Sequence, residues 1–210
     1  AMLNNTHLSD EEQAEALKRW WTDNGKSIIA GIVIGLSLVL GWQGWSRYQI
    51  EQSELASLEY DRLKSILQKN DTSAAAIQSD TIKQDYSSTS YSFFAALDLA
   101  KSYLEAEDYV KARSELEYAI ANAADEGLKA MAQARLARVL IAAGETDQAL
   151  AIANQNTVAA FAGDFAHIKG DIYREKGDLE SAKKAYAEAL ISSNNSSLLE
   201  MKLNEVNTGS

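Results

Sequence analysis

Hydrophobic and polar positions divide this chain into one continuously apolar stretch and a longer region whose apolar residues recur at helical spacing. The apolar stretch runs from Ile28 to Trp45 without a charged residue. As a helix it would be about 27 Å long, close to the thickness of the hydrocarbon core of a bilayer. A helix satisfies its own backbone hydrogen bonds in lipid, whereas a buried helix of a globular protein normally keeps a polar stripe. We therefore predict a transmembrane helix over residues 28–45.

Aromatic and glycine residues add two predictions about this helix. Aromatic rings favour the headgroup level of a membrane, and the candidate interface anchors that flank the stretch are Trp20, Trp21, Trp42, Trp45 and Tyr48. Gly31 and Gly35 form a G-x-x-x-G pair, which would let a second helix pack closely. The same pair arises by chance in apolar helices, so a packing role and a coincidence both stay open.

The flanks of the stretch indicate a retained anchor and its orientation. Residues 1–27 are net acidic and no small-residue cleavage pattern follows the apolar stretch, so the segment differs from a signal peptide. Lys18, Arg19 and Lys26 lie close before the stretch, whereas only Arg47 lies close behind it. The positive-inside rule then predicts a cytoplasmic tail over residues 1–27 and a carboxyl-terminal part on the other side of the membrane.

Within the tail we expect a short amphipathic helix over residues 9–22. Ser9 would begin it as part of a capping box with Glu12. Gly25 would end this segment, and Ser27 would then cap the membrane helix.

Residues 46–90 are expected to form membrane-proximal helices. One would continue the span over residues 47–69 and hold the following domain at a set distance from the bilayer, and a shorter one would cover residues 73–84. The chain contains no proline, so no ring clash interrupts a helix. The sequence therefore predicts an all-α fold with a single transmembrane helix.

The remainder, residues 91–210, contains an internal repeat. The aligned segments read AALDLAKSYLEAEDYVKARSELEYAI, AQARLARVLIAAGETDQALAIA and DFAHIKGDIYREKGDLESAKKAYAEAL. Each predicts a helix, a tight turn and a second helix with an alanine at a fixed position, namely Ala112, Ala149 and Ala182. These alanines are 37 and 33 residues apart. Only a small side chain fits where two antiparallel helices cross closely.

The third segment resembles the tetratricopeptide repeat, a 34-residue helix–turn–helix unit. The residues that fall where this motif places small and aromatic side chains are Gly170, Tyr173, Gly177, Ala182, Tyr186 and Ala189. The closing proline of the motif is absent, with Asn194 in its place, and the first spacing is longer than the motif. The resemblance implies a tetratricopeptide-like domain over residues 91–210, closed by a capping helix that begins near Ser197.

The resemblance also implies a concave face lined by the first helix of each pair. The groove residues it assigns are Phe94, Leu97, Lys101, Leu104, Met131, Arg138 and Ile141, followed in the third repeat by Asp164, His167, Asp171 and Arg174. Such an apolar groove suits an extended or helical partner segment. It lacks the cluster of basic and Asn residues that would grip a free chain terminus. Alternatively, the helix over residues 73–84 or the carboxyl-terminal helix fills the groove, and these residues are ordinary core.

Motifs of catalysis and cofactor binding are missing from the sequence. There is no P-loop, no G-x-G-x-x-G, no H-E-x-x-H and no cysteine. His167 lies near Asp164 and Asp171 on one helical face, which predicts a surface polar cluster rather than a metal or catalytic site. We therefore expect no enzyme activity, no cofactor and no metal. The net charge of −10 speaks against nucleic-acid binding, because an acidic surface repels phosphates.

Three stretches of the chain resemble the YfgM-like family, ancillary subunits of the bacterial SecYEG translocon. They are EEQAEALKRWWTDNGK, GIVIGLSLVLGWQGW and LKAMAQARLARVL. The resemblance covers nearly the whole chain. It implies a protein of the bacterial inner membrane whose amino terminus is cytoplasmic and whose repeat domain is periplasmic. It also implies the SecYEG translocon and a membrane-anchored periplasmic chaperone as partners, and a role in folding or transfer of exported proteins. Two other interpretations compete with this one. The chain could be an envelope scaffold that binds no client, or it could be a hydrolase or binding protein with an unfamiliar motif.

Overall fold

The structure, a computed structural model, describes residues 10–192 and 196–208, and all regular secondary structure in these ranges is helical. In chain order the helices are α1 (Asp10–Gln68), α2 (Thr72–Asp85), α3 (Ser90–Glu105), α4 (Tyr109–Ala121), α5 (Glu126–Ala142), α6 (Thr146–Asn154), the 3-10 turn η1 (Ala159–Phe161), α7 (Ala162–Glu175), α8 (Leu179–Ser192) and α9 (Ser196–Thr208). The prediction of an all-α fold is confirmed. The chain divides into two compact units, residues 1–51 and 52–210.

In the first unit, the described residues belong to α1 and include the predicted span. Within the described part of the chain, α1 is the one helix that is long and apolar enough to cross a membrane. Its large apolar side chains, from Ile29 to Leu40, are each more than half exposed. Within this unit no described residue covers them, as expected for side chains that face lipid.

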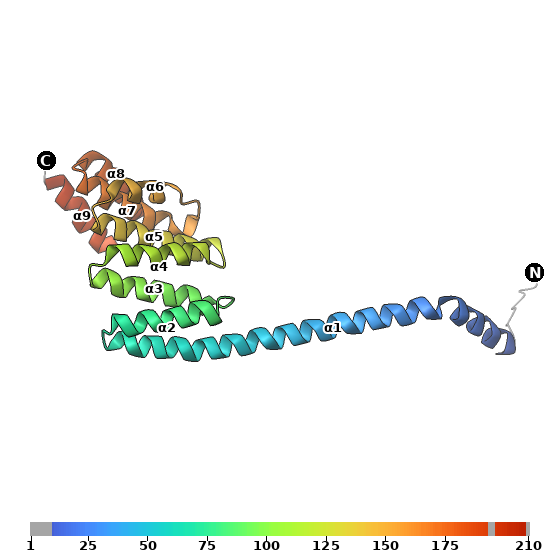
Figure 1. Ribbon diagram of the computed structural model, residues 1–210. Helices are drawn as coiled ribbons and strands as arrows, with labels where there is room; N and C mark the ends of the chain where they lie inside the picture. The colour runs from blue at the N-terminus through green and yellow to red at the C-terminus, as the bar shows by residue number, and fades with distance from the viewer. Residues whose placement is uncertain (1–9, 193–195, 209–210) are drawn as a thin grey trace, which may run out of the picture. The chain divides into compact units, whose positions relative to one another are not determined.

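The predicted helix boundaries around Gly25 are wrong, because α1 continues through Gly25 and Ser27 without a break. Gly25 does not end the helix; it lies buried under the indole of Trp21, which would be 3.3 Å from an added Cβ. Two side chains bond back to carbonyls one turn earlier, Thr22 Oγ1 to Lys18 at 2.8 Å and Asn24 Nδ2 to Trp20 at 3.0 Å. Bonds of this kind bend helices, and Figure 1 shows α1 bending in its darkest blue, amino-terminal part. The expected cap Ser9 lies outside the described residues.

The second unit is a stack of antiparallel helical hairpins that follow one another in chain order (Figure 1). The pairs α3/α4, α5/α6 and α7/α8 are the three predicted repeats. The carboxyl-terminal part of α1 and α2 form a further hairpin before them. The predicted helices of the membrane-proximal region are thus present, as the end of α1 and as α2, but they belong to the repeat array.

All four hairpins share one turn. The second residue after the first helix adopts a left-handed conformation, with φ of 55° at Asn70, 57° at Glu107, 79° at Gly144 and 76° at Gly177. An acidic residue follows each of them as the N-cap of the next helix: Asp71, Asp108, Glu145 and Asp178. The three aspartates accept a backbone N–H bond three residues on, at 3.0 to 3.2 Å, which satisfies one free donor of the helix.

The small residue at the helix crossing keeps a fixed distance from this turn. It lies five positions after the left-handed residue in every hairpin, at Ala75, Ala112, Ala149 and Ala182, and all four alanines are 0% exposed. The three predicted crossing alanines are therefore confirmed, and Ala75 is a fourth. In the last hairpin the partner helix contributes a glycine, because an added Cβ at Gly170 would lie 2.4 Å from the ring of Tyr186.

Helix α9 closes the array, as predicted. Its buried Leu199 and Val206 pack in one cluster with Tyr186 of α8. Its polar side contacts α7: Lys202 Nζ donates to Asp171 Oδ1 at 2.5 Å and lies 2.8 Å from His167 Nε2. The hydroxyl of Tyr186 donates to the same Asp171 oxygen at 2.7 Å.

These contacts correct one expectation about the groove. His167 and Asp171 were expected to line its third-repeat part, but they face α9 and bond to it. Arg174 likewise pairs with Glu205 of α9 at 3.3 Å. The alternative in which the carboxyl-terminal helix fills the groove is therefore correct for the third repeat.

The close crossing in the last hairpin generates a stability prediction. Ala182→Leu inserts a large side chain where the structure leaves no space and should cost ~1–3 kcal/mol of unfolding free energy. Thermal unfolding of the detergent-purified chain, followed by circular dichroism, should show a melting temperature lower by several degrees. Ala187→Leu is the control, because Ala187 lies on the exposed side of the same helix. Equal melting temperatures for the two variants would contradict the crossing.

The polar contact between α7 and α9 generates a pH prediction. Burial, followed by the charge of Lys202, holds the pKa of His167 below its ordinary value of 6.5, against the opposing influence of Asp171. The folded state therefore binds the proton less tightly, and stability that is fully present above pH 6.5 falls as the pH drops toward the lower folded value. Proton NMR should place the titration midpoint of the His167 ring below 6.5, and Lys202→Met should raise it. A midpoint at or above 6.5 in the unaltered chain would refute this assignment.

Candidate partner-binding groove

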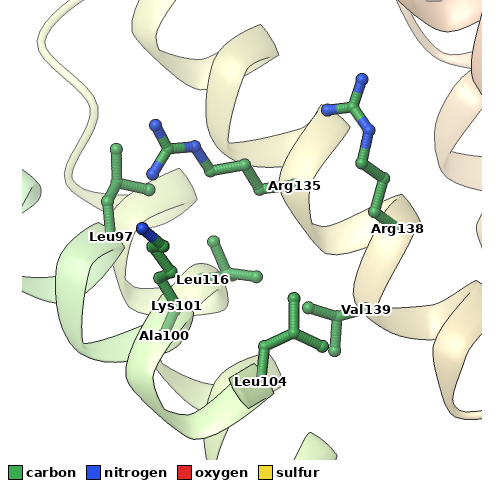
Figure 2. Close-up of a pocket in the computed structure, with 8 residues that line it drawn as sticks. All are labelled: Leu97, Ala100, Lys101, Leu104, Leu116, Arg135, Arg138 and Val139. Atoms are coloured by element: carbon green, nitrogen blue, oxygen red, sulfur yellow. The ribbon is translucent and has the colours of Figure 1, made fainter. Parts of the chain in front are cut away.

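A cavity of about 220 Å³ opens between α3 and α5 in the second unit. Its lining residues are Leu97, Ala100, Lys101 and Leu104 of α3, Leu116 of α4, and Arg135, Arg138 and Val139 of α5 (Figure 2). The lining on α3 follows from helical spacing, because residues three and four positions apart share a face. The cavity therefore lies on the face formed by the first helices of the second and third hairpins.

The floor of the cavity is apolar and belongs to the core. Leu97 is 2% exposed, Leu116 1% and Val139 2%, and all three pack in the cluster that joins α3 to α7. A floor of this kind offers an apolar surface without needing to move, because its side chains are already fixed by their neighbours. The cavity can accept an apolar side chain but contains no group with which to perform chemistry on it.

The rim of the cavity is basic. Lys101, whose side chain is 71% exposed, pairs with Glu105 only at 3.7 Å, and Arg138 reaches Asp164 only at 3.9 Å. Arg135 is exposed and makes no hydrogen bond or ion pair with the described residues. None of the eight lining residues is acidic, although the chain carries a net charge of −10. Figure 2 shows both arginines and Lys101 extending on the same side of the apolar floor.

The structure brings together four of the predicted groove residues. Leu97, Lys101, Leu104 and Arg138 line the cavity, as helical spacing suggested. Three others do not line it: Phe94, Met131 and Ile141 are partly buried and pack against the core cluster of the second unit. Periodicity placed them on the right helices but could not show how far they lie from the gap between α3 and α5.

Sequence reasoning missed Arg135. The sequence feature that could have revealed it is its position three residues before Arg138, on the same side of the helix. With Arg135, the rim of the cavity carries three cations, where the sequence had indicated only Lys101 and Arg138.

Neither of the two helices that were expected as alternatives to fill the groove, α2 and α9, covers this cavity. Its lining contains no residue of α2 and none of the described residues of α9. Helix α2 packs instead in the cluster with α1 and α3. The core interpretation is nevertheless correct for Leu97, so a charged residue at that position tests stability rather than binding.

A second, shallower depression adjoins the first and shares Lys101 with it. The end of α1 lines it with Lys64, Leu67 and Gln68, and α3 contributes Asp98 and Glu105 among others. Asp98 accepts a hydrogen bond of 2.6 Å from the hydroxyl of Tyr60. Burial, and then this bond, raises the pKa of Tyr60, so the hydroxyl remains a donor. The groove therefore extends from α5 across α3 toward α1.

The predicted membrane residues of the first unit are exposed. The side chains of Trp20, Trp21, Trp42, Trp45 and Tyr48 are each more than half exposed. An added Cβ at Gly31 or Gly35 would meet nothing within 4 Å. The roles of these residues as interface anchors and as a packing site stay predictions.

The described residues also bear on the predicted absence of a metal site. Among them, no three His, Asp or Glu side chains lie close enough together to hold a metal ion. His167 belongs to a polar cluster with Asp171, as expected, but the third member is Lys202 of α9 rather than Asp164. This cluster attaches α9.

Comparisons with known proteins agree with the fold and the anchor. Residues 18–208 match the family model of the tetratricopeptide repeat-like domain. The ancillary SecYEG translocon subunit of Haemophilus influenzae is 34% identical over 95% of this chain and 98% of its own length. The proteins of that name in Aggregatibacter actinomycetemcomitans and Escherichia coli are 35% and 29% identical, each over 95% of this chain and 96% of its own length. No solved structure matches the chain. A tetratricopeptide-like array behind one apolar helix, matched along nearly its whole length by these relatives, places the chain in the family of ancillary SecYEG translocon subunits.

Proposed function

We propose that this chain is an accessory protein of the Sec translocon in the bacterial inner membrane. Helix α1 anchors it, residues 1–27 are cytoplasmic and the repeat unit is periplasmic. The repeat unit binds partner proteins through the groove between α3 and α5 and assists the folding or transfer of exported proteins. Its partners are the SecYEG translocon, a membrane-anchored periplasmic chaperone and exported chains.

The observation that carries this proposal is a cavity of about 220 Å³ that has an apolar floor and that no described helix fills. Repeat proteins bury their apolar faces between neighbours, and the same face is covered by α9 at the third repeat. An apolar-floored cavity that stays unfilled in the middle of the array fits a partner segment that inserts a side chain. The groove lacks catalytic groups among the described residues, so a binding role without catalysis agrees with its chemistry.

The competing proposal is a scaffold of the envelope that holds membrane proteins together and binds no client. Under that proposal the groove would be occupied by a fixed neighbour or by nothing. The client-binding proposal and the scaffold proposal differ in whether an exported chain contacts Lys101 during export.

The proposed orientation predicts a labelling pattern. The chain has no cysteine, so single cysteines can be introduced without background. In intact spheroplasts, a membrane-impermeant maleimide should label Lys184→Cys, at an exposed position of α8. It should label Glu11→Cys only after the membrane is lysed. The reverse pattern would overturn the orientation that Lys18, Arg19 and Lys26 indicate.

The groove predicts position-specific crosslinks. A photoreactive amino acid at Lys101, on the rim, should form adducts with arrested exported chains in membranes that contain translocon. The same amino acid at Lys184, which is also exposed but lies on the second helix of its hairpin, should form few. Both replacements should leave the melting temperature unchanged, since both side chains point to solvent.

The outcome separates the two proposals. Crosslinks to exported chains at Lys101 support a client-binding groove. If the chain still co-purifies with the translocon but Lys101 never crosslinks to an exported chain, the scaffold is correct and client binding is refuted.

A further inference from the structure

The groove carries a charge pattern that a merely apolar docking site would not need. Each of its basic rim residues stands at the edge of the same apolar floor. No acidic residue lines the cavity itself, whereas Asp98 and Glu105 line the adjoining depression. Arg135 makes no ion pair with any described residue, and the ion pairs of Lys101 and Arg138 are long and exposed. In a chain with 30 acidic and 20 basic residues, this local excess of positive charge opposes the overall balance.

The arrangement of the three cations suits carboxylates of a partner chain. A guanidinium presents a planar pair of donors that matches a carboxylate. Arg135 and Arg138 lie three residues apart on α5, with their charged groups separated along the helix, and Lys101 faces them from α3 (Figure 2). Separated cations around an apolar floor suit separated carboxylates on either side of an apolar side chain.

The size of the cavity sets what can enter it. About 220 Å³ is below the range of roughly 300–1,000 Å³ typical of small-molecule sites, and it suits one bulky side chain. The neighbouring depression shares Lys101 and continues across α3 toward α1, so a segment longer than one residue can follow the groove.

We propose that the groove between α3 and α5 selects extended segments of partner chains in which an apolar side chain is flanked by acidic side chains. The apolar side chain fills the cavity, and the carboxylates pair with Arg135 and with Arg138 or Lys101. This inference rests on the proposed function and adds the chemical class of the bound segment. The positive charge of the rim also increases the rate at which acidic segments associate with the groove.

Fluorescence anisotropy with synthetic peptides tests this selectivity on the full chain in detergent micelles. The probes are short labelled peptides in a Gly-Ser background, acetylated and amidated so that no terminal charge takes part. Their central residues are Glu-Leu-Glu, Gln-Leu-Gln, Lys-Leu-Lys and Glu-Ala-Glu. We expect Glu-Leu-Glu to bind most tightly, with Gln-Leu-Gln and Glu-Ala-Glu weaker and Lys-Leu-Lys weakest.

Substitutions assign the effect to the rim. Arg135→Gln should weaken binding of Glu-Leu-Glu about two- to fivefold at low salt, as for other exposed ion pairs. Adding Arg138→Gln should bring the loss to about tenfold, and neither change should alter binding of Gln-Leu-Gln. Arg62→Gln is the matched control, because this exposed arginine pairs with Glu59 on its own helix and does not line the cavity. Raising NaCl from about 50 to about 500 mM should remove most of the preference for the acidic peptide.

The outcomes separate the acidic selectivity of the groove from the proposed function. If Gln-Leu-Gln binds as tightly as Glu-Leu-Glu and Arg135→Gln changes neither, acidic selectivity is refuted while a purely apolar groove, and with it the proposed function, stands. If no peptide binds, or if a Leu104→Gln variant binds all peptides as before, the groove is not the binding site and both proposals fail.

Discussion

The close crossing of two antiparallel helices in every hairpin is the constraint on which the repeat unit depends. A buried alanine occupies the crossing each time, five residues after a left-handed turn residue. Because the turn and the crossing keep this fixed distance, each hairpin enters the stack in the same way. The first helices of successive hairpins then form one face, and the space between α3 and α5 on that face becomes the groove.

That face is used differently at its two ends because its charges differ. At α7 it presents His167 and Asp171, and Lys202 of α9 bonds to both. At α3 and α5 it presents Lys101, Arg135 and Arg138, and no described acidic residue lies among the cavity lining. The chain's own helix therefore satisfies the polar residues of one part, while the basic part stays accessible to another molecule.

Much of this architecture could be predicted from residue patterns. An uncharged apolar stretch allows little besides a membrane helix, and the alanines at fixed spacing identified three hairpins. The first hairpin escaped notice because its first helix is the end of α1, which continues from the apolar stretch. Asn70, Asp71 and Ala75 nevertheless keep the common offsets. The expectation that Gly25 ends a helix was wrong for a different reason. A glycine destabilises a helix by only about 1 kcal/mol, and here the ring of Trp21 covers it.

The groove was only partly predictable, because periodicity defines a helical face but not what that face meets. Lys101 and Leu104 face the gap between α3 and α5, whereas Phe94, on the same helix, packs into the core. That difference depends on where α5 crosses α3. Arg135 could be recognised only once α5 was seen to line the same space as Lys101.

The attachment of α9 has a consequence for self-association. Its apolar contacts, Leu199 and Val206 against Tyr186, are accompanied by two charged contacts with α7, Lys202 with Asp171 and Arg174 with Glu205. Loss of those bonds would uncover the apolar side of α8 and of α9 together. Such an end surface resembles the unsatisfied interface between two neighbouring repeats, and a second array could stack on it. The charged contacts that attach α9 therefore also help to keep an apolar end surface covered.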